Sequence, residues 1–274
     1  MRTIAHISDL HFGRVDDSVA EGLVGDLHAQ SPNLVVASGD FTQRARAKQY
    51  AAARAFLGRL PKPQLVVPGN HDIPLWDVVR RFFFPLHRYR WFISKDLRPV
   101  HEDDQLLVIG INTARSFSWT WNGFWKDGKI SEEQLLDVRL RACPLPHTVF
   151  KVVVTHHPFI PPPGERLHGI VRGAHRALAR MEECGVDLCL AGHLHRGYSG
   201  DVRTHFEAVK RSIISVQAGT ATSTRRREEP NAYNLITINP DQLSIAVRAW
   251  TGARFEQTER THYARIDGVW QREG

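Results

Sequence analysis

The feature that most constrains the fold is a series of short apolar runs separated by helical patterns. Runs rich in β-branched residues, typical of buried strands, cover 4–8, 34–38, 65–67, 106–111, 149–155 and 186–191. Apolar residues at helical spacing lie between most of them, over 19–29, 47–60, 132–141 and 174–184. Strands that alternate with helices favour an α/β fold with a mainly parallel, helix-covered sheet.

The last third of the chain has a different pattern. Strand-like runs over 213–216, 234–238 and 243–249 follow one another without helices. We therefore expect a second, largely antiparallel sheet packed on the first, giving a two-sheet β-sandwich flanked by helices. Ser131-x-x-Gln134 predicts a capping box at one helix start. No low-complexity linker divides residues 1–274, so we expect one domain.

Polar groups that bind metals follow five of the predicted strands. The segments are 9–11 (Asp-Leu-His), 39–44 (Gly-Asp-Phe-Thr-Gln-Arg), 68–72 (Pro-Gly-Asn-His-Asp), 155–158 (Thr-His-His-Pro) and 192–195 (Gly-His-Leu-His). Ligand sites in such sheets collect at the carboxyl ends of strands. The i, i+2 spacing of the first and last segments points two side chains the same way in extended backbone. Imidazole with carboxylate suits Zn, Mn, Fe or Co.

The order of these motifs resembles the calcineurin-like metallophosphoesterase family, over the stretch from Asp9 to His195. The resemblance implies a four-layer αββα fold and two divalent metal ions. It implies that a hydroxide bridging the metals attacks the phosphorus atom. Asp9, His11 and His195 would bind one ion, Asn70, His156 and His193 the other, and Asp40 would bridge them.

The same resemblance assigns two catalytic residues. His71 corresponds to the histidine that assists the leaving group, and Asp72 to the carboxylate after it, which either takes part in catalysis or only orients. Arg44 has the offset of a phosphate-binding arginine, although Ala45 replaces the usual glycine; the alternative is a helix cap.

The remaining polar candidates have weaker patterns. Asn70 is a candidate for substrate binding as well as for metal binding, and His157 either touches substrate or packs. We expect His6 to be a core histidine. Asn112 either supports the site or forms a turn.

The resemblance is strongest to the bacterial branch of cyclic-nucleotide phosphodiesterases, with glycerophosphodiesterases nearby. We therefore expect hydrolysis of a 3′,5′-cyclic nucleotide. A lipid- or glycerol-linked substrate such as UDP-2,3-diacylglucosamine is the alternative, as is a non-catalytic scaffold. The net charge of +7 supports a DNA nuclease, but the one dense basic run, 225–227, is followed by two glutamates. We do not expect nucleic acid as the partner.

Two aromatic segments each have alternative interpretations, which imply different binding partners. Residues 80–93 form either a cap or homodimer surface, or a core helix and turn. Residues 116–129 carry Phe117, Trp119, Trp121, Phe124 and Trp125. They form a small satellite core, stack a nucleobase, or contact a lipid chain or membrane surface.

Cysteine content and hydropathy predict the compartment. Cys143, Cys184 and Cys189 are few and odd in number, so we expect lone thiols and a reducing environment. No apolar run approaches the roughly 20 residues of a membrane span, and no signal peptide is apparent. These observations predict a cytoplasmic protein.

Overall fold

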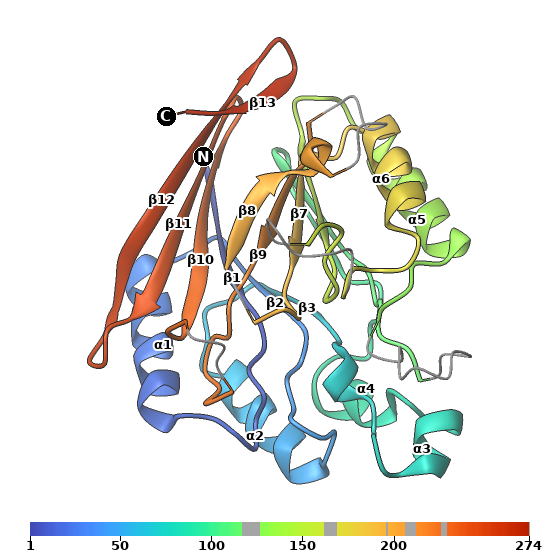
Figure 1. Ribbon diagram of the computed structural model, residues 1–274, viewed down its shortest axis with the longest axis vertical. Coiled ribbons are helices and arrows are strands. Elements are labelled where there is room, and N and C mark those ends of the chain that lie inside the picture. Colours follow the sequence, from blue (N-terminus) through green and yellow to red (C-terminus); the bar gives the residue numbers. More distant parts are fainter. Residues whose placement is uncertain (117–126, 162–168, 196, 206–211, 226–228, 274) are drawn as a thin grey trace.

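Strands β1 (Arg2–Ile7), β2 (Leu34–Ser38) and β3 (Gln64–Val67) run parallel at one side of a seven-stranded sheet. Its other strands are antiparallel: β10 (Ala232–Asn239), β11 (Gln242–Trp250), β12 (Phe255–Ile266) and β13 (Val269–Arg272). The order is β13-β12-β11-β10-β1-β2-β3. The computed structural model describes residues 1–116, 127–161, 169–195, 197–205, 212–225 and 229–273 (Figure 1).

A six-stranded sheet faces the first, in the order β4-β5-β6-β7-β9-β8. Its parallel centre is β5 (Leu106–Gly110), β6 (Phe150–Val154), β7 (Leu188–Ala191) and β9 (Ile214–Gln217). The edge strands β4 (Val100–Glu102) and β8 (Tyr198–Asp201) pair antiparallel.

Helices cover the outer face of each sheet. α1 (Asp17–Gln30) and α2 (Ala47–Leu57) pack on the first sheet, and α5 (Glu132–Ala142) and α6 (Ala174–Glu183) on the second (Figure 1). The shorter elements are η1 (Asn70–Asp72), α3 (Val78–Phe83), α4 (His87–Phe92) and η3 (Val202–Thr204). The predicted four-layer α/β sandwich is thus confirmed.

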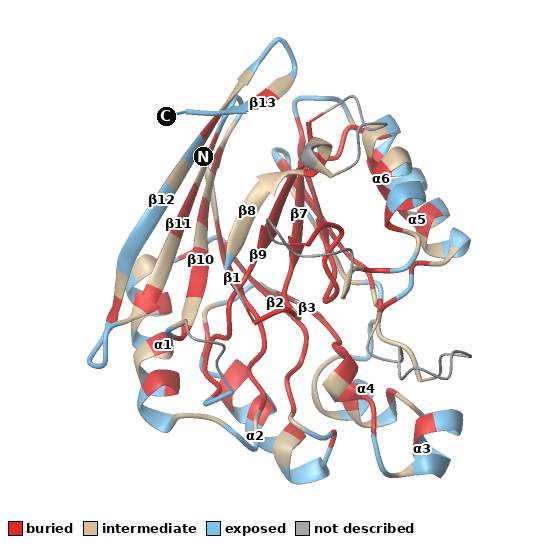
Figure 2. Cartoon of the chain, in the orientation of Figure 1, coloured by how far each residue is buried: buried red, intermediate tan, exposed pale blue. Residues whose placement is uncertain are grey.

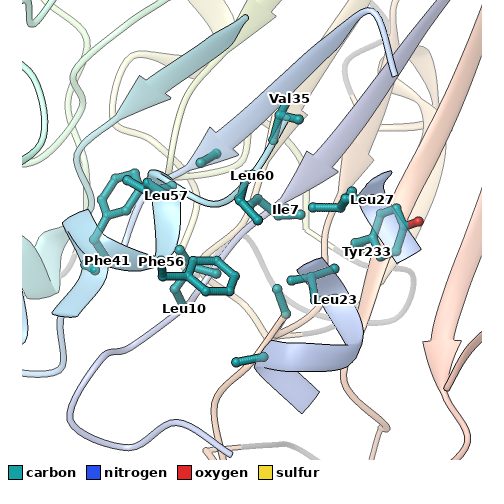
Figure 3. Packing of buried hydrophobic residues seen from close by; sticks show 14 of the residues in the cluster. Ile7, Leu10, Leu23, Leu27, Val35, Phe41, Phe56, Leu57, Leu60 and Tyr233 are labelled. Atoms are coloured by element: carbon teal, nitrogen blue, oxygen red, sulfur yellow. The ribbon is translucent and has the colours of Figure 1, made fainter. Parts of the chain in front are cut away.

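Strand alternation builds three apolar layers. In β1, Ile4 points between the sheets, whereas Ala5 packs with the helices. Figure 2 shows the central strands buried and the outward faces of α5 and α6 partly exposed. Leu23 and Leu27 of α1 meet Ile7 and Val35 of the sheet in the outer layer (Figure 3).

Helix ends follow local chemistry. Ser131 Oγ accepts from the amide of Gln134, whose side chain accepts from the Ser131 amide, so the predicted capping box is present. Asp16 caps α1 by accepting from the amides of Ser18 and Val19. None of the described helices has the length and apolar character that a bilayer crossing requires.

The prediction of a separate C-terminal sheet was wrong. β10 pairs antiparallel with β1, Ile236 opposite Ile4, so the C-terminal strands extend the first sheet. The predicted strand at 213–216 joins the other sheet as β9, beside β7. Strand propensity does not show which free sheet edge a strand will pair with, because that choice depends on tertiary contacts.

The segment after β3 is mostly at the surface. Trp76, Phe83, Phe84 and Trp91 are exposed, while Tyr89 of α4 is buried. The core alternative therefore fits only part of 80–93. In the second aromatic segment, 117–126 lie outside the described residues.

The cysteine prediction was wrong for one pair. Cys143 and Cys184 form a disulfide, and only Cys189 is a free, buried thiol. The two bonded residues follow the last turns of α5 and α6, which bring their Cα atoms to 4.2 Å. A separation of 41 residues in sequence gives no sign of this proximity.

Candidate metal centre

The candidate ligands lie on the loops directly after β1, β2, β3, β6 and β7. Their backbone is unusual, since φ is positive at five of them: Asp9 (55°), His11 (48°), Asp40 (55°), His193 (75°) and His195 (57°). Non-glycine residues rarely adopt this conformation, which costs on the order of 1–3 kcal/mol each and concentrates at functional sites. The expectation of extended backbone at the two i, i+2 pairs was therefore wrong.

Three side chains form the first group of candidate ligands: Asp9, His11 and His195. Oδ1 of Asp9 lies 3.4 Å from Nε2 of His11 and 3.6 Å from Nδ1 of His195. All three residues are buried, and their ligand atoms lie within 4.8 Å of one another. This spacing allows one ion to contact all three.

Asn70, His156 and His193 form the second group. Oδ1 of Asn70 is 3.1 Å from Nε2 of His156 and 3.1 Å from Nδ1 of His193. His156 Nδ1 lies 2.7 Å from the Ser38 carbonyl, which can only accept. In the neutral ring the proton is therefore on Nδ1, and the lone pair of Nε2 faces the cluster, as a metal-binding imidazole requires.

Asp40 lies between the two groups. Its Oδ2 is 3.7 Å from Nε2 of His11 and 3.4 Å from Nε2 of His156. The structure thus brings all seven candidate ligands together, with Asp40 beside one histidine of each group.

Unpartnered atoms test whether metal ions fit here. Oδ1 of Asp9 and both ring nitrogens of His11 are buried without a hydrogen-bond partner among the described residues. Buried polar atoms are nearly always paired, so such a concentration needs an explanation. Divalent ions held by these nitrogen and oxygen atoms supply one.

The electrostatics of the cluster are coupled. Burial opposes the charge on Asp40, yet His156 and His71 hold the pKa of its carboxyl well below the usual range. Burial also disfavours a charged His156, but Asp40 outweighs it and raises the pKa of His156 to about 9. Burial, followed by the charge of His156, lowers the pKa of His193 to about 3.

Two glycines allow the loops to approach the ligands. A Cβ on Gly69 would lie 2.1 Å from Oδ1 of Asp40. A Cβ on Gly192 would lie 1.8 Å from Oγ of Ser8 and 2.6 Å from Oδ2 of Asp9. Any larger residue at these positions would have to displace a ligand.

His71 and Asp72 are adjacent in sequence but differ in position. The His71 amide donates to Oδ1 of Asp40 at 2.8 Å, and its ring lies beside the His11 ring, with centroids 4.9 Å apart. The buried Asp72 carboxylate instead accepts from the amides of Phe41, Thr42 and Gly69. Its position suits the alternative of orienting the loops.

The candidate substrate residues are spread more widely. His157 is buried, with Nδ1 2.8 Å from Oγ1 of Thr113 and its ring centroid 4.5 Å from that of His193. Arg44 is exposed, and its backbone amide donates to the Gln49 side chain. Within the described part of the chain, no contact joins the Arg44 side chain to the cluster. Ala45, in the place of the family's glycine, has φ of 50°.

His6 and Asn112 have contacts that bear on what the sequence predicts for them. Nε2 of His6 lies 2.8 Å from Oγ of Ser38, and burial lowers the pKa of His6 to about 3, as suits a core histidine. Asn112 accepts from the amide of Ala114, which suits a turn residue.

Sequence reasoning missed Arg225. Its Nη1 lies 2.8 Å from Nε2 of His71, although 154 positions separate the two residues. Thr220, from the same loop, lies 2.8 Å from Nδ1 of His195. The only sequence signal was the basic run 225–227. It indicated a local positive charge but not that this charge lies beside His71.

Comparison with known proteins agrees with the geometry. The sequence model of the calcineurin-like phosphoesterase family matches residues 2–197. The glycerophosphodiester phosphodiesterase GpdQ of Enterobacter lignolyticus is 30% identical over 193 residues, which are 65% of each chain. A probable cyclic nucleotide phosphodiesterase of Synechococcus is 32% identical over 81 residues, or 26% of this chain and 32% of that one. The chain thus spans less than two thirds of these relatives' lengths.

Solved structures show the same fold. A dimetal phosphatase from Danio rerio superposes with a TM-score of 0.66 at 12% identity, covering 93% of this chain and 98% of that one. The purple acid phosphatase PPD1 of yellow lupin superposes with a TM-score of 0.67 at 10% identity, covering 93% of this chain and 52% of that one.

Proposed function

We propose that this chain, which belongs to the calcineurin-like phosphoesterase family, hydrolyses phosphodiesters with two divalent metal ions. The observation that carries the proposal is the position of Asp40. Its Oδ2 lies 3.7 Å from His11, in the group with Asp9 and His195, and 3.4 Å from His156, in the group with Asn70 and His193. Two ions held there would lower the pKa of a bound water and offset charge on the phosphate.

The chain's own residues then have separate tasks. Asp40 fixes His71 beside the cluster through the backbone amide at 2.8 Å. The Gln43 carbonyl, 2.9 Å from Nδ1 of His71, holds the ring so that Nε2 faces the site. From there His71 can exchange a proton with the leaving oxygen, which is the role that we propose for it. Asp72 positions the loops that carry both residues.

A small phosphodiester is the proposed substrate. The relative that matches over 193 residues bears the name of a glycerophosphodiester phosphodiesterase, so a glycerophosphodiester is the first candidate. A 3′,5′-cyclic nucleotide, expected from the sequence, is the second and has the shorter match in its support. A cytoplasmic location stays part of the proposal, although the Cys143–Cys184 disulfide weakens the thiol argument for it.

A substrate panel tests the proposal. Manganese-loaded protein would be assayed with glycerophosphoethanolamine, 3′,5′-cyclic AMP, bis(p-nitrophenyl) phosphate and p-nitrophenyl phosphate, with Asn70→Ala as control. The proposal predicts diester turnover that the variant loses. Turnover of the monoester alone would contradict it. Absence of turnover with metals bound would favour a non-catalytic scaffold.

A further inference from the structure

Arg225 is held by a loop that is anchored to the first metal-binding segment. The Ala221 amide donates to the Ser8 carbonyl at 3.0 Å, and the Thr224 amide donates to the Arg14 carbonyl at 2.8 Å. These bonds fix the backbone on both sides of Asp9 and His11. The backbone that leads to Arg225 is therefore held against the segment that carries two of the candidate ligands.

The guanidinium of Arg225 points to the catalytic edge of the cluster. Its Nη1 lies 2.8 Å from Nε2 of His71, and the residue is exposed to solvent. Among the described residues, no carboxylate pairs with it. An exposed arginine beside a candidate phosphate site, without a carboxylate partner among the residues that the structure describes, is suited to bind an anionic oxygen.

The contact with His71 is one that substrate must break. Nδ1 of His71 donates to the Gln43 carbonyl, so Nε2 carries the lone pair that accepts from Arg225. A leaving-group oxygen can take a proton from His71 only when the ring has bound a proton at Nε2, and a ring protonated there cannot accept a hydrogen bond from Arg225. Substrate that occupies Nε2 therefore displaces Arg225 by the few ångströms that its flexible side chain allows.

We propose that Arg225 is a substrate-binding residue that turns from His71 to a non-bridging oxygen of the phosphodiester. The proposal rests on the proposed phosphodiesterase function and adds a specific contact to it. Two charge-assisted hydrogen bonds from one planar guanidinium match the geometry of a phosphate group. The loop thus supplies the cationic contact for which the family resemblance made Arg44 a candidate.

Anion binding without turnover is the first test. Inorganic phosphate would be titrated calorimetrically into manganese-loaded wild type, Arg225→Ala and Arg225→Lys. Arg139→Ala, an exposed change on α5, is the matched control. We expect Arg225→Ala to weaken phosphate binding about 10- to 100-fold and Arg225→Lys to restore part of it. Equal binding by wild type and Arg225→Ala would overturn the proposal.

A purely structural role for Arg225 predicts different kinetics. If Arg225 only oriented His71, its loss would slow esters with alkoxide leaving groups and spare bis(p-nitrophenyl) phosphate. We expect KM for both kinds of diester to rise, also in a His71→Ala background. An effect confined to poor leaving groups would overturn the inference. If wild type turns over neither diester but binds phosphate through Arg225, the proposed function fails and this contact stands.

Discussion

Oδ1 of Asp40 accepts the backbone amide of His71 at 2.8 Å, while Oδ2 of the same carboxylate faces His11 and His156. One side chain therefore joins the candidate metal centre to the residue proposed for the leaving group. We therefore expect a change in metal binding at Asp40 to alter the position of His71.

Replacing Asp40 by Asn removes the charge between the two groups and keeps the shape. We expect the variant to retain fewer than two manganese ions per chain after gel filtration, and diester turnover to fall by more than about 100-fold. Elemental analysis and a bis(p-nitrophenyl) phosphate assay measure both. Asp241→Asn, at an exposed turn, is the control; full metal content in Asp40→Asn would argue against the bridging role.

His71→Ala separates chemistry from metal binding. The side chain faces the cluster but is not needed as a ligand, so both metals should stay bound. Turnover of esters with poor leaving groups should drop about 10²- to 10⁴-fold. Bis(p-nitrophenyl) phosphate, whose leaving group needs little protonation, should be affected less. Unchanged turnover of the poor esters would remove His71 from the mechanism.

Gly69→Ala tests the close approach of two loops. The added Cβ would lie 2.1 Å from Oδ1 and 2.4 Å from the amide of Asp40. We expect lower thermal stability and loss of metal. Gly25→Ala is the control, because Gly25 is exposed in α1 with no atom near the added Cβ. It should raise stability by about 0.5–1 kcal/mol. Metal binding in Gly69→Ala equal to wild type would show that the loops can separate.

Metal affinity should depend on pH. Asp40 outweighs burial and raises the pKa of His156 from 6.5 to about 9, and a metal ion binds only the neutral ring. Apparent manganese affinity should therefore rise up to about tenfold per unit between pH 7 and pH 9 and then level off. Protonated His156 stabilises the metal-free folded chain. This contribution to the free energy of unfolding should be lost as pH rises from about 6.5 to about 9. Manganese titrations across that range measure the slope, and a flat response would refute this assignment.

Thiol counting tests the disulfide. Denatured protein, prepared without reductant, should react as one thiol per chain if Cys143 and Cys184 are bonded, leaving Cys189 alone. Three reactive thiols in protein taken directly from cells would contradict the disulfide. They would support the reducing compartment that the sequence predicted.

The site was more predictable than the sheet arrangement. Strand ends such as those before Asp9 and Asp40 combine apolar runs with abrupt polar motifs, so local sequence carries both signals. The pairing of β10 with β1 depends on which sheet edge is free, which local sequence does not encode. The middle of β12 is largely exposed and polar, so the sequence showed no apolar pattern from which this strand could be predicted.

Contacts between residues far apart in the sequence could not be predicted for a related reason. Arg225 and His71 meet only because the loop after β9 packs on the segment after β1. Left-handed backbone at His11 and His193 likewise depends on hydrogen bonds from other loops, such as the one from the His11 amide to the Asp40 carbonyl. No residue-type pattern within either segment indicates these partners.

The most direct test of the account is diester turnover measured while manganese is titrated into metal-free protein. Two ions held on either side of Asp40 predict that bis(p-nitrophenyl) phosphate hydrolysis keeps rising until about two equivalents are bound and then stays constant. Full activity at one equivalent, or no hydrolysis with two ions bound, would contradict a two-metal phosphodiesterase.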